Sequence, residues 1–427
     1  MDLVGSQLRA IRPLAVQLRE WCSRHRRALL LVLIVAMGVE ATGYLLYELW
    51  RLLLEHGFKG ATDLGHRLRE THSWFARRPV YGRIPGAVYP PATYLLLWPF
   101  VGWLGLGTAR WLWALPMLAG VVWLVILVLR ESRPGNSLER TAIVLALLAT
   151  YATGQTIGNG QLPLVVLPLL LAALLALRRP SAGLRADLLV ALLLVGALVK
   201  VIDVVPFLVV AAVAPWRKRP LVLAAVAYAG LTLVAAAFQR PSLASLIRQW
   251  LKAGSSAASA RISDNYGNVH AWLSAAGLKA WILPLSGLIL VALAYWSWRH
   301  RSVDRWILIG VAAYVARLWT YHRSYDDLLI VLPMVALFRI ATASRARELD
   351  VTAVVVLAAT VAVMLVPGGL YGLPAVLQSP FTSLEAVIWL AGLGFLLLRA
   401  RVLADPRPSH LPGAIRENER QRTSSSA

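Results

Sequence analysis

The sequence predicts an all-α membrane protein that crosses the bilayer several times. Of its 427 residues, 58% are hydrophobic and 15% are charged, and the mean hydropathy is +0.64, which lies outside the range of soluble domains. Apolar runs of about twenty residues, the length of a membrane-spanning helix, recur along the chain. Lys and Arg gather in the segments between these runs. We expect about twelve spans, several of them short or tilted.

The charge and the cysteine content limit the classes of function. A net charge of +22 would indicate nucleic-acid binding in a soluble protein. Here the basic residues lie between apolar runs, where the positive-inside rule and anionic lipid headgroups account for them. We therefore expect membrane lipids, and no nucleic acid, as partners. The single cysteine, Cys22, precludes an internal disulfide and a cysteine metal cluster.

The N-terminal segment sets the expected orientation. Residues 1–27 carry six arginines ahead of the first apolar run at 28–50, which places the N-terminus in the cytoplasm. The run is too long for the core of a signal peptide, and no small-residue cleavage site follows it. We expect a retained span, so the long polar segment that begins at residue 51 lies on the outer side.

The segment at 89–107 allows two counts of the spans. If it crosses the membrane, every later basic loop faces outward; if it lies in the outer interface, these loops fall inside. They are residues 130–140, 178–187, 216–220, 299–305 and 344–350. The charge bias therefore predicts interfacial helices in an outer loop at 51–107, within a single transmembrane domain at 28–400. Residues 401–427 are predicted to be a disordered cytoplasmic tail.

On this count the unusual polar residues share the outer side. The later outer connections are residues 154–161, 200–203, 239–279, 321–327 and 368–383. With the first outer loop they carry Asp63, Gln155, Asn159, Gln161, Lys200, Asp203, Asn265, Asn268, His270, His322, Asp326 and Asp327. An enclosed outer cavity is the simplest structure that would gather them. The active site would then face the periplasm or the cell exterior from the cytoplasmic membrane.

Asp63 is the predicted catalytic residue. His66, Arg67 and Glu70 follow it at i+3, i+4 and i+7, which places four ionisable groups on one helical face. Apolar residues occupy the opposite face, so the helix would lie flat on the bilayer and present its ionisable face outward. Asp63 could act as a general base, or it could be a surface aspartate paired with Arg67. The arginines of this loop either touch headgroups or, as we consider for Arg67, clamp a phosphate.

Three further cations or imidazoles are candidates for contact with a phosphate. Lys200 and Asp203 interrupt an apolar run, and an ionisable residue at such a depth is a functional candidate. A structural ion pair at a turn between two short helices would give the same sequence pattern. Arg317 and His322 lie at the outer end of a later helix and could stabilise charge on a leaving phosphate. Alternatively, Arg317 pairs with a nearby aspartate.

Amide side chains cluster in GQTIGNGQ and NYGNVH. They suit hydrogen bonds to sugar hydroxyls, although Gly-Asn clusters are also common in turns. The predicted hydroxyl contacts are Gln155, Asn159, Gln161, Asn265, Asn268 and Tyr89. The sequence contains no Walker motif, dinucleotide fingerprint or HExxH motif, and no DxD in its outer loops. We therefore predict a metal-independent reaction without a cofactor.

Four stretches resemble a known family. They are Asp63 followed by YPPATYLLLWPF, then GQTIGNGQLPLVVLPLLLAALLAL, LVKVIDVVPFLVV and SYDDLLIVLP. The chain resembles the polyprenyl-phosphate-mannose-dependent mannosyltransferases of the GT-C superfamily, which include bacterial alpha-1,2-mannosyltransferases. The resemblance implies a GT-C fold with interfacial helices over a cavity, and an inverting transfer with Asp63 as the base. The family has a tyrosine soon after this aspartate, whereas this chain reads DLGHRL, so mannose is an expectation.

The residues and the resemblance together predict a membrane glycosyltransferase. It would move a sugar, mannose by resemblance, from a polyprenyl-phosphate donor to a hydroxyl of a lipid- or glycan-linked acceptor. The candidates for binding the donor phosphate or sugar are Lys200, Arg317, His322 and Arg67. The alternative is a lipid-linked-sugar flippase or secondary transporter with Glu40, Lys200 and Asp203 at the midplane. A transporter is expected to show two related halves, and the sequence has no internal repeat. A partner in an envelope-synthesis complex without chemistry of its own is a third possibility.

Overall fold

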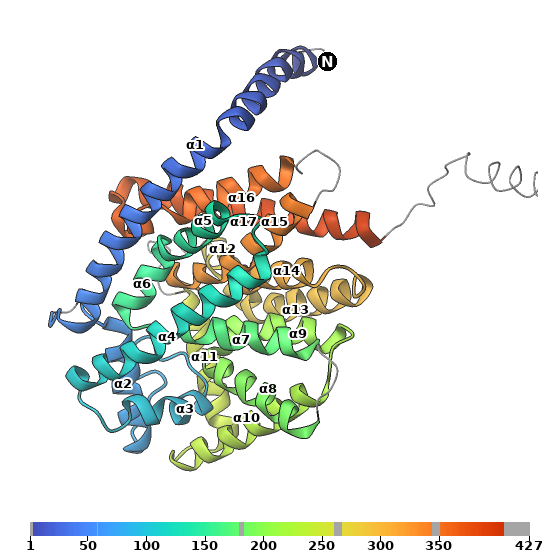
Figure 1. The fold of residues 1–427 in the computed structure, drawn as a ribbon. Coiled ribbons are helices and arrows are strands. Elements are labelled where there is room, and N and C mark those ends of the chain that lie inside the picture. Colours follow the sequence, from blue (N-terminus) through green and yellow to red (C-terminus); the bar gives the residue numbers. More distant parts are fainter. Residues whose placement is uncertain (1–2, 58, 179–182, 260–266, 344–350, 405–427) are drawn as a thin grey trace, which may run out of the picture.

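The computed structural model describes residues 3–57, 59–178, 183–259, 267–343 and 351–404, and within these ranges every regular element is a helix (Figure 1). The α-helices are α1 (Leu3–Leu53), α2 (Thr62–Phe75), α3 (Pro91–Val101), α4 (Leu106–Ser132), α5 (Ser137–Leu148), α6 (Tyr151–Asn159), α7 (Pro163–Leu177), α8 (Leu184–Ala197), α9 (Val201–Val213), α10 (Arg219–Ala237), α11 (Leu243–Ser259), α12 (Val269–Ala275), α13 (Ile282–Arg299), α14 (Arg305–Leu318), α15 (Val331–Ala343), α16 (Val351–Met364) and α17 (Ala375–Ala404). Short 3-10 helices are η1 (Leu198–Lys200), η3 (Lys279–Trp281), η4 (Ser324–Ile330) and η5 (Gly369–Gly372).

The chain is a multi-pass helical membrane protein. In the part of the chain that the structure describes, 6 helices are long and apolar enough to cross a membrane, or 7 if the pair α5 and α6, bent by 44°, forms one span. The six are Arg27–Leu53, Leu106–Ser132, Leu184–Val213, Arg219–Ala237, Lys279–Arg299 and Ala375–Arg401. Three shorter apolar helices are α3, α7 and α16. The count falls below the predicted twelve, partly because helices expected to be separate spans join or stay short.

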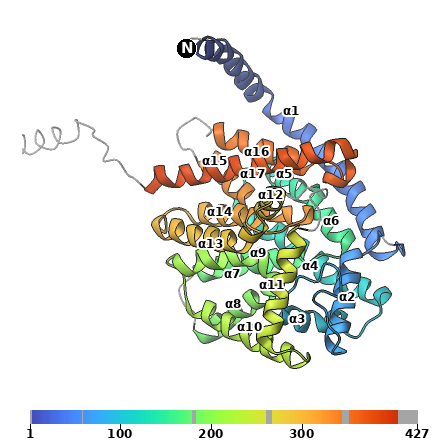
Figure 2. The ribbon, with the colours of Figure 1, turned by 180° about the vertical axis from the view of Figure 1, so that it is seen from behind.

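Helix α1 is continuous from Leu3 to Leu53, so the predicted boundary at residue 27 falls inside it. Its first part projects beyond the bundle, and its second part runs along the bundle toward α2 (Figures 1 and 2). At the other end of the chain, α17 extends to Ala404, so the predicted disordered tail at 401–427 is wrong for its first four residues, and the rest of it lies outside the described residues. The ends of the predicted transmembrane domain are therefore helical.

The first outer loop folds onto the bundle. Helix α3 has 11 residues, about 16 Å of helix, which is too short for a hydrocarbon core of about 30 Å. By length alone, α3 is therefore not a candidate span. Helix α2 was predicted to lie flat with its ionisable face outward, and that orientation is wrong. It packs beside α3 and α4, and its side chains Arg67 and Glu70 are buried inside the protein.

Trp74 fixes the end of α2 to the bundle. Its side chain is fully buried, and its indole N–H donates to the carbonyl of Ala235 in α10 at 2.9 Å. The ring stacks on Tyr94 of α3 with centroids 4.7 Å apart. Gln239 donates to the carbonyl of Trp74 at 2.6 Å. These contacts hold the first outer loop against a helix more than a hundred residues later.

The predicted turn at 200–203 is a break inside one candidate span. Helices α8 and α9 meet at η1 and together form the apolar segment Leu184–Val213. Pro206 in α9 has no N–H to donate to the carbonyl of Ile202, four residues earlier. The indole of Trp319 donates to that carbonyl at 3.1 Å instead. The freed backbone group is thus satisfied by a neighbouring element, as membrane helices require.

The predicted outer connection at 154–161 is mostly helical. Residues 154–159 belong to α6, and Gly160, with a φ of 68°, caps its end. A Cβ on Gly154 would lie 2.2 Å from the Tyr44 ring of α1, and a Cβ on Gly158 would lie 1.7 Å from the Glu48 carboxylate, so these glycines permit the close approach of the two helices. Arg51 of α1 contacts Glu48 at 2.6 Å and the Asn159 side-chain oxygen at 2.9 Å. These glycines and the Arg51–Asn159 hydrogen bond therefore join α6 to the first span.

We expect Trp74→Ala to lower the free energy of unfolding by about 3–5 kcal/mol, because it removes a fully buried ring and its hydrogen bond. The measurement is the midpoint of thermal unfolding of the purified protein in detergent. Trp103→Ala is the matched control, since that side chain is 64% exposed, and its effect should stay within about 0.5 kcal/mol. Equal effects of the two variants would contradict the anchoring role of Trp74.

Candidate active site

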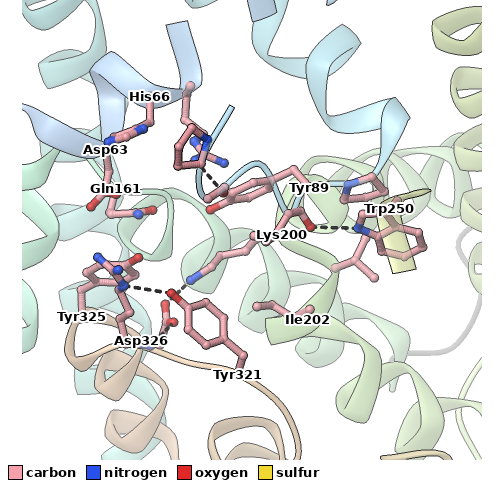
Figure 3. Close-up of a pocket in the computed structure, with 17 residues that line it drawn as sticks. Asp63, His66, Tyr89, Gln161, Lys200, Ile202, Trp250, Tyr321, Tyr325 and Asp326 are labelled. Atoms are coloured by element: carbon pink, nitrogen blue, oxygen red, sulfur yellow. Dashed lines mark hydrogen bonds and ion pairs between the residues drawn. The ribbon is translucent and has the colours of Figure 1, made fainter. Parts of the chain in front are cut away.

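A cavity of about 550 Å³ lies between α2, the loop that follows it, α11, the α8–α9 break and the loop before η4 (Figure 3). Five residues selected from the sequence line it: Asp63, Arg67, Tyr89, Gln161 and Lys200. Residues from distant parts of the chain thus share one cavity, although most of the polar residues that we expected to gather on the outer side do not line it. The geometry differs from the prediction, because Lys200 reaches the cavity from the middle of a candidate span.

The cavity is polar at one end and apolar at the other. Asp63, His66, Gln161 and Tyr325 lie on one side of the view in Figure 3, and Trp250 and Ile202 lie on the opposite side. Lys200 and Tyr89 lie between the two groups. The remaining apolar lining includes Pro85, Val88, Pro90 and Val201. One ammonium group therefore separates a hydrogen-bonding region from a hydrocarbon-like region.

Asp63 lies in the first turn of α2 and is half-buried. Its carboxylate forms no hydrogen bond or ion pair with the part of the chain that the structure describes, and the predicted alternative, a pair with Arg67, does not form. Its neighbour His66 accepts a hydrogen bond at Nδ1 from Arg69 at 3.1 Å, since a guanidinium can only donate. Burial lowers the pKa of His66, so its ring is neutral at pH 7.

Arg67 is held in place by a carboxylate and an aromatic ring. Its guanidinium pairs with Glu70 at 2.8 Å and lies 4.2 Å from the centroid of the Tyr89 ring. Burial raises the pKa of Glu70 to about 7, although the Arg67 charge acts in the opposite direction. Two nitrogens of Arg67, Nε and Nη1, have no hydrogen-bond partner in the described structure. The guanidinium is thus fixed at the cavity wall with donors unused.

Lys200 joins two carboxylates from different elements. Its side chain is 3% exposed, and Nζ lies 3.1 Å from Asp203 and forms a second ion pair with Asp326. The Tyr325 ring centroid lies 5.2 Å from Nζ. His322 Nδ1 lies 3.2 Å from Asp326 and 3.5 Å from Asp203. Burial lowers the pKa of His322, which lies in the loop before η4, to about 4, so the ring is neutral.

The same cluster has the spacing of a metal site. Ligand atoms of Asp203, His322 and Asp326 lie within 4.8 Å of one another, and a divalent cation could be bound by such a set. The ammonium of Lys200 already contacts both carboxylates, however. A metal ion would have to displace this buried lysine, so the donor set fits an internal cation better than an added one.

Arg317 and His322 were predicted to meet the donor phosphate, and neither lines the cavity. Arg317 is buried and forms an ion pair with Asp327, the residue next to Asp326. Tyr151 donates to Asp327 at 2.7 Å and also contacts Glu385. His322 lies behind Asp326 and is fully buried. Both side chains therefore contact carboxylates of the protein and sit behind the cavity wall.

Most of the predicted amide contacts are structural. Gln155 donates to the carbonyl of Gly368 at 2.8 Å and accepts from Ser324 at 2.5 Å. Asn159 accepts from Arg51, and Asn268 caps α12 by accepting from the N–H of Ala271 at 3.0 Å. Asn265 lies outside the described residues. Of the predicted amides in the described ranges, Gln161 lines the cavity.

Sequence reasoning missed an aromatic and cationic part of the lining. Arg323 donates from Nε to the Tyr321 hydroxyl at 2.9 Å, and both residues line the cavity. Trp250 of α11 also lines it and donates to the carbonyl of Val88 at 2.8 Å. The sequence contains signals that could have identified these residues. YHRSYDD mixes aromatic and ionic residues, and LASLIRQWLKA has the apolar spacing of an amphipathic helix.

Comparison with known proteins gives one family. A family model described as Glycosyltransferase family 87 matches residues 87–344, which is more than half of the chain. The matched region includes Tyr89, Gln161, Lys200 and Asp326, whereas Asp63 precedes it. No curated protein and no solved structure gave a match.

We expect Lys200→Met to destabilise the protein by about 3–5 kcal/mol, because two buried carboxylates lose their cation. Adding Asp326→Asn should recover part of this loss, so the effects of the two substitutions should fall short of their sum. The measurement is a double-mutant cycle of unfolding midpoints in detergent. Lys252→Met, at an exposed position of α11, is the control. Additive effects would show that the two side chains do not interact.

We expect the pH dependence of stability to report the burial of Glu70. Its pKa of about 7 lies above the ordinary value of 4.5, so its contribution to stability is present below about pH 4.5 and is lost as the pH rises through about 7. Relative to Glu70→Gln, wild-type protein should lose up to about 3 kcal/mol over this range. Unfolding midpoints at several pH values measure the difference, with Glu55→Gln as the control. Parallel curves for wild type and Glu70→Gln would contradict the assignment.

Proposed function

The chain belongs to glycosyltransferase family 87 and is a membrane glycosyltransferase, and we propose that it transfers a sugar, mannose in our proposal, from a polyprenyl-phosphate donor to a hydroxyl of a lipid- or glycan-linked acceptor. The observation that carries the choice of donor is the division of the cavity into a polar end and an apolar end with a buried cation between them. A lipid-phosphate sugar has the same three parts in the same order.

The three parts of such a donor match three regions of the lining. The sugar fits the end with Asp63 and Gln161, where carboxylate and amide groups can bind hydroxyls. The first isoprene units fit the end with Ile202 and Trp250. The phosphate then lies in the middle near Lys200. A nucleotide sugar would place a base and a ribose at the apolar end, where hydrogen-bonding side chains are few.

Asp63 is the proposed general base. It takes the proton of the acceptor hydroxyl as that oxygen attacks the anomeric carbon from the face opposite the phosphate. The bond between the anomeric carbon and the phosphate oxygen breaks, and the lipid phosphate leaves with the electron pair. The configuration at the anomeric carbon is inverted. The carboxylate of Asp63 supports this role, because it forms no ion pair in the described structure that protonation would break.

Cations of the cavity wall stabilise the leaving phosphate. Arg67, Lys200 and Arg323 line the cavity, and each has a partner that fixes its position before the donor binds. Fixed cations stabilise developing charge without reorganisation during the reaction. In this proposal Arg323 replaces the earlier candidates. Arg317 and His322 act as positioning residues that hold the two aspartates of η4.

The proposed location is the outer side of the cytoplasmic membrane. Six arginines precede the first span, and the loops at 130–140 and 299–305 are basic, which supports a cytoplasmic position for these segments. The cavity begins beyond the opposite end of α1, next to α2. The same sidedness supports donor entry from the outer leaflet, with the isoprenoid between helices.

We expect Asp63→Asn to lower the rate of sugar transfer by between about a hundredfold and ten-thousandfold, because the acceptor hydroxyl loses its base. The measurement is transfer of radiolabelled sugar from a synthetic lipid-phosphate donor in detergent, where a transporter has no compartments to work across. The unfolding midpoint should change little. Glu55→Gln, in the same loop but outside the cavity lining, should keep its activity. Near-normal transfer by Asp63→Asn would remove the proposed base.

We expect Ile202→Gln to raise the KM for a long-chain polyprenyl donor roughly tenfold and to leave kcat nearly unchanged, because it places an amide where hydrocarbon binds. A donor in which a methyl group replaces the whole polyprenyl chain should be less affected. Initial rates at varied donor concentration measure both constants. Ile247→Gln on α11, which does not line the cavity, is the matched control. Equal changes for long and short donors would place the isoprenoid elsewhere.

A further inference from the structure

We propose that a second, apolar groove in this protein binds an acyl chain of an anionic phospholipid. The groove has a cavity volume of about 160 Å³ and lies between α1, α4, α5, α15 and α16. Its wall is hydrocarbon along almost its whole length, with Leu33, Met37, Ala142, Phe338 and Val361 among the lining residues. Figures 1 and 2 show α1 beside α5 and α16 in this region.

The groove is separate from the active-site cavity. Met37 lies about 24 Å from Leu53 along α1, and the active-site cavity lies beyond Leu53. The two sites therefore lie near opposite ends of the first span. The isoprenoid of a donor bound near Asp63 does not account for the groove.

The position of the groove indicates a lipid chain as its occupant. α1 and α4 are both candidate spans, so the groove opens into the hydrocarbon region of the membrane. The span of α1 is only 11% buried, which shows how little of it the protein itself covers. An empty apolar groove forfeits dispersion contacts that a flexible hydrocarbon chain can supply. Lipid bound there would complete the packing of α1 on α5 and α16.

The charges at the end of the groove indicate an anionic headgroup. Arg27, Arg133 and Arg140 are exposed, and each lies within three residues along the chain of a residue that lines the groove. Glu139 also lines the groove, and its carboxylate accepts the N–H of Gly135 at 2.8 Å. Three exposed arginines against this one carboxylate give the end of the groove a net positive charge, which favours phosphatidylglycerol-like lipids over zwitterionic ones.

Native mass spectrometry of the full-length protein in detergent tests the proposal. The protein is incubated with phosphatidylglycerol or phosphatidylcholine of identical acyl chains, and bound lipid is counted. We expect phosphatidylglycerol to be retained preferentially, by about fivefold for each guanidinium engaged. Arg133→Gln combined with Arg140→Gln should remove most of this preference. Arg299→Gln combined with Arg301→Gln, two exposed arginines of another loop, should leave it intact.

Filling the groove tests the position of the lipid. Ala142→Trp should abolish the retained lipid, whereas Ala36→Trp, on the exposed face of α1, should keep it. Unfolding midpoints and size-exclusion profiles identify a misfolded variant, and Ala146→Trp is the second groove-filling variant. Equal retention of the two lipids by wild type would overturn the proposal. So would full retention by both groove-filling variants, or a lipid-free dimer with a second copy in the groove.

Discussion

The ammonium of Lys200 is the group on which the structure of the site depends. A buried cation is tolerated only when anions compensate the lost hydration, and here Asp203 and Asp326 do so. Asp326 lies 126 residues further along the chain, so this contact joins the α8–α9 break to η4. Residues of both elements line the cavity. The need of one buried lysine for anionic partners thus joins two elements that line the cavity.

The aspartates of η4 extend this constraint to a second cluster. Asp326 contacts Lys200, and its neighbour Asp327 contacts Arg317 and Tyr151. Successive residues of a 3-10 helix point about 120° apart, so two adjacent carboxylates can reach two separate cations. η4 is therefore held from both sides, and a rotation of this element would break both ion pairs. Its position, and that of the cavity wall, is fixed before any substrate binds.

The sequence predicted the helical membrane fold class and two residues that line the cavity, Asp63 and Lys200, for physical reasons. Apolar runs of spanning length have few explanations other than a membrane, and an ionisable pair such as Lys200 and Asp203 within such a run is costly enough to be noticed. Asp63 was found from its helical spacing with other ionisable groups. Each of these signals is local, so a single sequence contains it.

The errors came from signals that depend on tertiary contacts. Arg67 and Glu70 satisfy each other inside the protein, and a helix with such a face looks solvent-exposed in the sequence. Gln155 and Asn159 lie in GQTIGNGQ, where the glycines permit close packing of α6 on α1 and were read as turn residues. The number of spans depends on how helices join at breaks, which a hydropathy pattern does not specify.

The pairing of charges also distinguishes the base from the cations in the proposed reaction. Arg67 is paired with Glu70 and Lys200 with two aspartates, so the carboxylates of these pairs are committed to cations of the protein. Asp63 lines the same cavity without such a partner in the described structure. Protonation of a paired carboxylate would break its ion pair. Among the carboxylates that line the cavity, Asp63 can therefore accept a hydrogen bond from an acceptor hydroxyl without breaking an ion pair of the protein, while the paired cations stay in place for the phosphate.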